Sequence, residues 1–254
     1  MTALVPVAVG LVALVYAMVG HAGATGYIAV LAIAGVAPGV IRPTALLLNV
    51  VVAAIGTVQF VRAGHFRPDV FWPLAAASVP AAFLGGTLAL STAVFETIVG
   101  VVLLVAATQL VAATARAEPE PAGRRPTPAA LGALGAGIGL LSGLTGVGGG
   151  VFLSPVLLAL RAASVRGVAA VAAPFILVNS LAGLAGGAVT GAAWPPIVPW
   201  VVAAAIGGAT VGSQLGAFRL PVRALRIVLA VVLAAAAWKL LAAAREGCIP
   251  YLTV

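Results

Sequence analysis

The sequence is poor in charge. Only 7% of its 254 residues are charged and 63% are hydrophobic, with a mean hydropathy of +1.24. Because a soluble domain carries about 25% charged residues, this composition excludes a water-soluble protein and predicts a polytopic membrane protein. Regular alternation of apolar and polar residues is also lacking, whereas runs of Ala, Leu and Val dominate. Membrane helices are therefore favoured over a transmembrane β-barrel.

Cysteine and acidic residues are scarce as well. The one cysteine, Cys248, can form neither an intrachain disulfide nor a metal cluster. The five acidic residues all fall at the ends of apolar segments or in a polar connection, so no carboxylate is expected at mid-membrane depth. This pattern disfavours cation transport and a carboxylate proton relay. We expect no metal site and no cofactor.

Basic residues outnumber acidic ones, and the formal net charge is +8. In a soluble protein this excess would suggest binding to nucleic acid. Here the arginines lie in short connections between apolar runs, where basic residues set membrane topology. We therefore expect the lipid bilayer, and not nucleic acid, as the partner. The N-terminal apolar run lacks the basic start of a signal peptide, and we take it as the first membrane segment.

Five apolar segments precede a polar break, and five follow it. The break is rich in proline and charge, as linkers are. We predict a first membrane repeat over 1–113, a cytoplasmic linker over 114–128 and a second membrane repeat over 129–254. The segments cover about 3–19, 27–37, 44–61, 70–90 and 92–113, then about 129–142, 150–160, 167–190, 196–217 and 221–244.

Matching residues indicate that the two halves are repeats. Trp72 and Trp200 follow comparable connections, and Asn49 and Asn179 both lie within apolar segments. A glycine-rich break occurs in each half. The distance from the aligned glycine to the asparagine is 26 residues in the first half but 33 in the second, so the first repeat has lost about two helical turns or the pairing slips. The aligned glycines are Gly20, Gly23 and Gly26 with Gly143, Gly146 and Gly149.

One segment of each half is too short to span. A transmembrane helix needs about 17–25 apolar residues, and 27–37 and 150–160 fall below this length. Each follows a glycine break, so we predict a re-entrant hairpin whose irregular backbone is buried in protein. The expected fold is all-α, with two inverted repeats. Each repeat holds a glycine-broken re-entrant helix pair and about three spanning helices.

The basic residues favour an odd number of crossings per half. If each half is a hairpin plus three spans, ten of the 13 Lys and Arg residues lie on one side, and Arg42, Lys239 and Arg245 lie on the other. Four spans per half would divide them seven to six. The positive-inside rule favours the first arrangement, with both termini outside the cell. An odd count also inverts the two halves, as in many secondary transporters.

The glycines of the second break predict an anion site. Gly148–Gly150 directly precede a short apolar helix, whose N-terminus carries roughly half a positive charge. Glycine lets an anion approach the bare backbone, and without a following Lys the run is not a nucleotide-binding loop. A tight hairpin tip without a ligand is the alternative. By contrast, Gly135 and Gly139 predict close helix packing.

Polar side chains complete the candidate site. Asn49 and Asn179 are either uncharged donors to an anion or interhelical hydrogen bonds worth about 0.6 kcal/mol each. His21 is ionisable and expected at membrane depth, where such residues are functional by default, although a neutral, hydrogen-bonded histidine is the alternative. We predict no catalytic residue. The candidate substrate-binding residues are Gly20, His21, Gly23, Thr25, Gly26, Asn49, Thr145, Gly146, Gly148, Gly149, Gly150 and Asn179.

The stretch SGLTGVGGGVFLSPVLL, residues 142–158, resembles the sulfite exporter TauE/SafE family of membrane proteins. The two-half layout, the polar linker and Pro155 agree with this resemblance, whereas the first break, GHAGATGY, lacks the triple glycine and the downstream proline. The resemblance implies movement of sulfite, sulfonates or other sulfur-containing anions across the plasma membrane.

We therefore expect a secondary transporter of a small sulfur-containing inorganic or organic anion, exported or imported. An anion channel, a non-transporting scaffold or assembly factor, and a homodimer are left open. A scaffold would tolerate Gly149→Leu, and a transporter would not. An intramembrane serine hydrolase would need His21 to reach Ser142, because His65 falls in a connection, and we disfavour it.

Overall fold

The computed structural model describes residues 4–18, 21–88, 90–115, 126–160, 162–163, 165–189, 198–216 and, from 230 to 244, all but 232, 236 and 243. The regular structure of these residues is α-helical, which confirms the predicted all-α class. Gly20, most of the linker 114–128 and Cys248 lie outside them. The helices are α1 (Leu4–Met18), α2 (Ala24–Ile33), α3 (Pro38–Arg62), α4 (Pro68–Thr87), α5 (Thr92–Ala115), α6 (Pro128–Thr145), α7 (Gly150–Ala159), α8 (Val165–Val189) and α9 (Val198–Gly216), with further helical residues between 230 and 244.

Five of the described helices, α3, α4, α5, α6 and α8, are long and apolar enough to cross a membrane. α2 and α7 have 10 residues each. At a rise of 1.5 Å per residue they are about 15 Å long, half of the roughly 30 Å hydrocarbon core. The predicted short helix after each glycine break is therefore confirmed. α6 extends further than predicted, to 18 residues, whereas α1 has 15.

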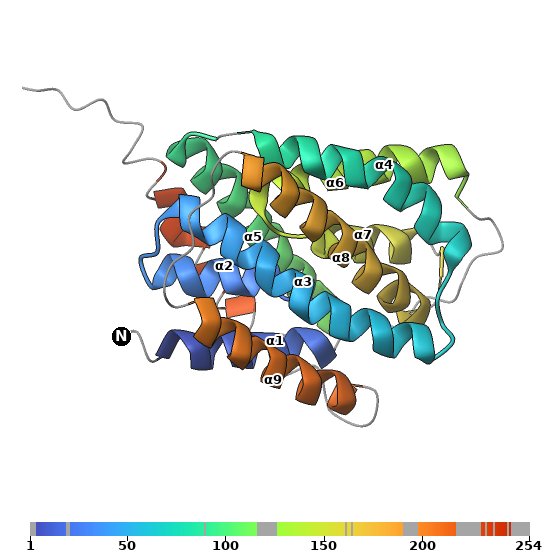
Figure 1. Ribbon diagram of the computed structural model, residues 1–254, viewed down its shortest axis with the longest axis horizontal. Coiled ribbons are helices and arrows are strands. Elements are labelled where there is room, and N and C mark those ends of the chain that lie inside the picture. Colours follow the sequence, from blue (N-terminus) through green and yellow to red (C-terminus); the bar gives the residue numbers. More distant parts are fainter. Residues whose placement is uncertain are drawn as a thin grey trace, which may run out of the picture.

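Two long helices form the centre of the molecule. α3 and α8 run antiparallel in contact with each other, with the pair α1 and α9 on one side and the pair α4 and α6 on the other (Figure 1). Along their contact, Gly56 faces Ala173 and Leu46 faces Gly183. Residue positions near 49 on α3 and near 180 on α8 therefore lie opposite each other, within the middle part of both helices.

Glycines let the outer pairs of helices approach until their backbones touch. A Cβ atom at Gly139 of α6 would collide with the backbone of Ser78 on α4, and one at Gly135 would collide one turn earlier. On the other side, a Cβ at Gly212 of α9 would collide with the backbone of Leu14 on α1. Close contact through small residues drives helix association in lipid. The packing role predicted for Gly135 and Gly139 is confirmed.

Two basic side chains bind the ends of helices. The Arg42 guanidinium donates to the carbonyl oxygens of Gly85 and Gly86, at 2.8 and 2.5 Å, where α4 ends. Lys239 Nζ donates to the carbonyl oxygen of Ala32 at 2.7 Å, where α2 ends. Helix C-termini carry a partial negative charge that favours a cation. Arg42 and Lys239 are two of the three basic residues that the charge count placed on the less basic side of the membrane. Their bonds to helix ends give each a structural reason to lie on that side.

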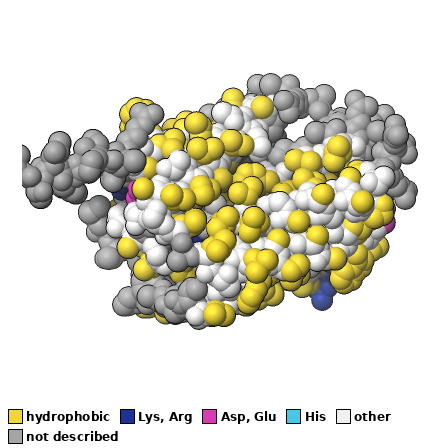
Figure 2. Space-filling view, turned by 90° about the horizontal axis from the view of Figure 1, so that it is seen from above, with side chains coloured by type: hydrophobic (Ala, Val, Ile, Leu, Met, Phe, Trp, Pro, Cys, Tyr) yellow, Lys and Arg dark blue, Asp and Glu magenta, His cyan; other side chains and the backbone are white. Residues whose placement is uncertain are grey.

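Apolar side chains cover much of the face shown in Figure 2, as a surface in contact with lipid requires. Large exposed residues include Trp72 near the start of α4 and Trp200 in the first turn of α9, which are 65% and 71% exposed. Tryptophan is enriched at both membrane–water interfaces. Since α4 begins at the right-hand end of Figure 1 and α9 at the left-hand end, the matching tryptophans lie toward opposite ends of the molecule.

Candidate functional site

The second tip, residues 146–150, is a turn of left-handed glycines between α6 and α7. Gly146, Gly148 and Gly149 have φ values of 78°, 76° and 81°, a region that costs other L-residues about 1–2 kcal/mol each. The carbonyl of Gly149 accepts from the N–H groups of Phe152 and Leu153, at 3.2 and 3.0 Å, and so starts α7. The first N–H groups of α7 have no acceptor inside the helix, so they point out of its N-terminal end.

The described part of the first tip, residues 21–26, has one left-handed glycine. Gly23 has a φ of 94° and is the N-cap residue of α2. The hydroxyls of Thr25 and Tyr16 lie 2.7 Å apart, and a Cβ at Gly26 would press on the side chains of α1. These contacts hold α2 against α1. Among the described candidates of this tip, only His21 is recorded in contact with the second half of the chain.

His21 joins the two tips. Its Nε2 lies 2.9 Å from the Oγ of Ser154, one turn into α7. Its Cδ2 lies 3.6 Å from the position that a Cβ at Gly150 would occupy. The structure therefore brings the two glycine breaks into contact at the N-terminal turn of α7. His21 and Ser154 contribute polar atoms beside the buried backbone of that turn.

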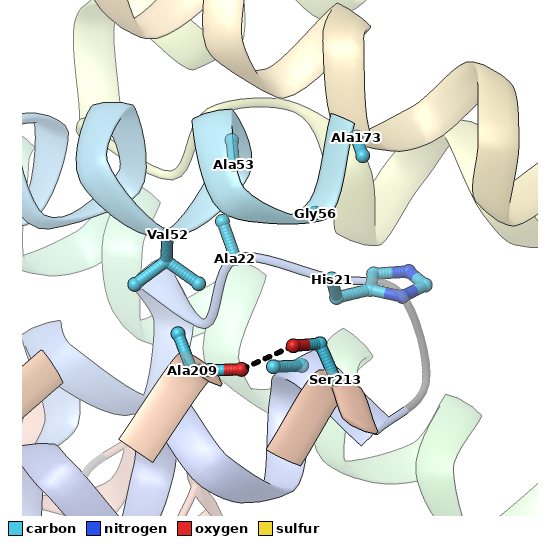
Figure 3. Close-up of a pocket in the computed structure, with 9 residues that line it drawn as sticks. His21, Ala22, Val52, Ala53, Gly56, Ala173, Ala209 and Ser213 are labelled. Atoms are coloured by element: carbon cyan, nitrogen blue, oxygen red, sulfur yellow. Dashed lines mark hydrogen bonds between the residues drawn. The ribbon is translucent and has the colours of Figure 1, made fainter. Parts of the chain in front are cut away.

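A small hollow lies behind His21, between α1, α3, α8 and α9. It has a volume of about 10 Å³ and is lined mainly by alanine, with His21 and Ser213 as its polar members (Figure 3). In this view the imidazole ring of His21 points away from Ser213. Such a volume is about that of a single water molecule. This hollow is therefore too small to hold an oxyanion.

The two asparagines contact different partners. Asn49 Nδ2 donates to the carbonyl of Val147 in the second tip, at 3.3 Å. Asn179 Nδ2 donates instead to Ser78 Oγ on α4 and to the carbonyl of Phe175, at 3.0 and 2.8 Å. Because a carbonyl oxygen only accepts, these bonds fix the orientation of both amides. The expected donors are therefore engaged with the protein, and the buried Oδ1 atoms have no partner among the described residues.

The remaining candidates of the second tip lie against its walls. Thr145 donates to the carbonyl of Leu141, at 2.6 Å, in its own helix. Gly146 packs on the backbone of Arg42, whose carbonyl oxygen would lie 3.0 Å from an added Cβ. A Cβ at Gly149 would lie 2.8 Å from the side chain of Ile138 on α6. These residues shape the turn and do not add free polar side chains to it.

Three polar residues of the site were not among the predicted binding residues. Ser154 bonds to His21, and Ser180 Oγ would lie 3.1 Å from a Cβ at Gly148. The hydroxyl of Tyr27 lies 3.1 Å from the equivalent position at Gly23. Ser180 directly follows Asn179, and Ser154 lies one turn after Gly150. Their closeness in sequence to predicted site residues is the one feature that could have identified them. The Oγ of Ser180 and the hydroxyl of Tyr27 are buried without a partner among the described residues.

Comparison with known proteins identifies the family. The family described as sulfite exporter TauE/SafE matches residues 5–240. The chain belongs to the TauE/SafE family. It is also similar to the probable membrane transporter protein y4hK of Sinorhizobium fredii (strain NBRC 101917 / NGR234), with 40% identity over 232 residues, 91% of this chain and 94% of that protein. No solved structure matches. As a TauE/SafE protein, the chain is a multi-pass membrane transporter and not an enzyme.

The donor set suits an anion better than a metal complex. In the part of the chain that the structure describes, no group of three His, Cys, Asp or Glu residues is placed to hold a metal ion. The N-terminal turn of α7 offers backbone N–H groups, with His21 and Ser154 beside them. A helix N-terminus framed by polar side chains can hold a small oxyanion without a fixed positive charge.

Proposed function

We propose that the chain is a secondary transporter that carries a small sulfur-containing anion, such as sulfite or a sulfonate, across the plasma membrane. The anion binds at the N-terminal turn of α7, between the two glycine tips. The observation that carries this proposal is the contact of His21, in the first tip, with Ser154 of α7, next to Gly150 of the second tip. The similar probable membrane transporter and the sulfite exporter family support the transported class.

The charge at the site suits capture with release. The N-terminus of α7 supplies about half a positive charge, and Gly150 places no side chain of its own over that backbone. A Lys or Arg in its place would cost about 2.5–3.5 kcal/mol on insertion scales and would hold an oxyanion tightly. His21 and Ser154 lie within hydrogen-bonding distance of each other and supply polar atoms that do not carry a permanent charge. Of the remaining predicted residues, Gly23 to Gly26 on one side and Asn49 and Thr145 to Gly148 on the other shape or flank this turn, whereas Asn179 bonds to Ser78 on α4.

We further propose that the two halves are inverted repeats with both termini outside and a cytoplasmic linker. The helix contacts agree with a two-fold relation in which α1 to α5 correspond, in order, to α6 to α9 and the helical residues after 230. α1 packs on α9 as α6 packs on α4, and α3 contacts α9 as α8 contacts α4. The ten-to-three division of basic residues supports the orientation. Alternating access would then follow from one half moving against the other.

Uptake by proteoliposomes tests the proposed function. The purified protein is reconstituted and offered sulfite, a sulfonate, sulfate and chloride in turn. The proposal expects saturable uptake of at least one sulfur-containing anion and exchange with the same anion inside. An anion channel would instead give a current that does not saturate in this way. No movement of any sulfur-containing anion by folded protein would leave the scaffold alternative and refute the proposal.

A further inference from the structure

His21 places a group that can bind a proton beside the proposed anion site. Its Nε2 lies 2.9 Å from Ser154 Oγ on α7, and its Cδ2 lies 3.6 Å from the position of a Cβ at Gly150. Its ring also borders the small hollow between α1, α3, α8 and α9 (Figure 3). An imidazole accepts a proton near neutral pH. The structure thus brings a titratable ring to the positive end of α7.

The other ionisable residues on the elements nearest to His21 are tyrosines and arginines. Tyr16 on α1 and Tyr27 on α2 stay neutral at pH 7. The described helices α7 and α9 contain no ionisable residue. None of these groups therefore gains or loses a proton near neutral pH.

The arginines of α3 and α8 lie further along their helices. Gly56 and Ala173 line the hollow beside His21. On α3, Arg62 follows Gly56 and Arg42 precedes it, and on α8 Arg166 precedes Ala173. At a rise of 1.5 Å per residue, each arginine position is about 9 Å or more along the helix from these lining residues. A bound anion next to His21 would therefore be the nearest full charge to its ring.

A proton on His21 and an anion at the start of α7 favour each other. Without the anion, the N-terminus of α7 opposes a second positive charge beside it. With the anion bound, an opposite charge stands close to the ring and favours the imidazolium. Both ring nitrogens of the imidazolium donate, so Nε2 then donates to Ser154 Oγ. By reciprocity, the proton raises the affinity for the anion by the same factor.

We propose that His21 binds one proton together with each anion, so that the transporter carries both in the same direction. The inference rests on the proposed function. The proton comes from water on the side where the anion binds, is held by the imidazole, and returns to water where the anion leaves. A monovalent sulfonate would then cross the membrane without net charge. A histidine carries this proton without the carboxylate relay that the sequence disfavours.

Titration calorimetry counts the proton. The purified protein is titrated with methanesulfonate, which takes up no proton itself near neutral pH, in Tris and in bis-Tris. These buffers carry no sulfonate group and differ in their heat of ionisation, so the difference in heat gives the protons taken up per anion. We expect uptake of a fraction of one proton at pH 7. The dissociation constant should rise about tenfold or more from pH 5 to pH 9, as the imidazolium is lost.

His21→Gln keeps a hydrogen-bonding group but cannot hold the proton. This variant should bind methanesulfonate without proton uptake and with the same dissociation constant at pH 5 and pH 9. His65→Gln is the matched control, because His65 is the other histidine of the sequence and is exposed in the connection between α3 and α4. It should keep the proton uptake of the unmodified protein. For sulfite, which itself titrates near neutral pH, the coupled proton is the difference between these two variants.

Proteoliposomes test the coupling even if His21→Gln does not fold. With the unmodified protein, a gradient that is acid outside should drive methanesulfonate inward, and a membrane potential alone should not. Transport driven by the potential and indifferent to the pH gradient would overturn the coupling.

The outcomes separate this inference from the proposed function. Anion binding without proton uptake by the unmodified protein would overturn the coupling and leave the proposed function intact. Equal proton uptake by folded His21→Gln and the unmodified protein would overturn the assignment to His21. Binding of neither methanesulfonate nor sulfite by folded protein would refute the proposed function, and the coupling with it.

Discussion

Replacing Gly150 by alanine should separate anion binding from folding. Gly150 is a helical residue without a positive φ, so alanine gains up to about 1 kcal/mol of helix propensity. The added Cβ would lie 2.8 Å from Ile176 Cγ1 and would overlap Cδ1, the end of that flexible side chain. Such overpacking costs about 1–3 kcal/mol. We therefore expect the free energy of unfolding to fall by about 0–2 kcal/mol.

The effect on the anion should be larger. The same methyl group stands between the backbone of α7 and the ring of His21, 3.6 Å from Cδ2. A hydrogen bond to a charged group contributes about 1.5–3 kcal/mol. Losing one such bond raises the dissociation constant about 10- to 150-fold, since 1.4 kcal/mol is tenfold. Isothermal titration of the purified protein with sulfite measures this change, and thermal unfolding in the same detergent measures stability.

Gly137→Ala is the control for this substitution. Gly137 is also helical, in α6, and a Cβ there would meet nothing within 4 Å. Its affinity for sulfite should equal that of the unmodified protein. If folded Gly150→Ala binds sulfite as tightly as Gly137→Ala, the N-terminus of α7 is not the anion site. Gly149→Leu cannot serve here, because its φ of 81° and its contact with Ile138 would destabilise the fold whatever its role.

Three further outcomes test other parts of the account. His21→Gln keeps a hydrogen-bonding group near Ser154 but cannot titrate, so the pH profile of transport should flatten between pH 5 and 8; an unchanged profile would make His21 purely structural. Cysteine at position 122, in a background lacking Cys248, should resist an impermeant thiol reagent added outside cells, and labelling would refute the cytoplasmic linker. Gly139→Ala should lower the melting temperature well below that of Gly137→Ala, because its Cβ collides with backbone; equal melting temperatures would contradict the backbone contact between α4 and α6.

Helix positions could be predicted from the sequence because apolar length and glycine breaks are local signals. The predicted segment 70–90 corresponds to α4 over Pro68–Thr87, and 150–160 to α7 over Gly150–Ala159. Of the two explanations for the unequal glycine-to-asparagine distances, the helix lengths favour a slip in the pairing over the loss of two turns. α2 and α7 both have 10 residues, and α3 and α8 both have 25. The seven extra residues arise from the second tip, the connection after α7 and the later position of Asn179 in its helix.

The partners within the site could not be predicted from the sequence, because they depend on packing between distant segments. Asn49 and Asn179 look equivalent in the sequence, yet one reaches the second tip and the other bonds to Ser78 on α4. The contact between His21 and Ser154 joins residues 133 positions apart. The sequence does not distinguish Ser180 from other serines in apolar helices, because a buried serine usually bonds to its own helix. Only the three-dimensional arrangement shows that its hydroxyl has no such partner among the described residues.

Locating the bound anion tests the central proposal most directly. Selenite has the shape and charge of sulfite, and its selenium scatters anomalously, so crystals grown with selenite would reveal its position in an anomalous difference map. We predict a peak at the start of α7, with a selenite oxygen about 3 Å from the N–H nitrogen of Gly150 or Val151 and next to His21. A peak elsewhere on the protein, with this turn empty although sulfite competes for the bound selenite, would contradict the proposal.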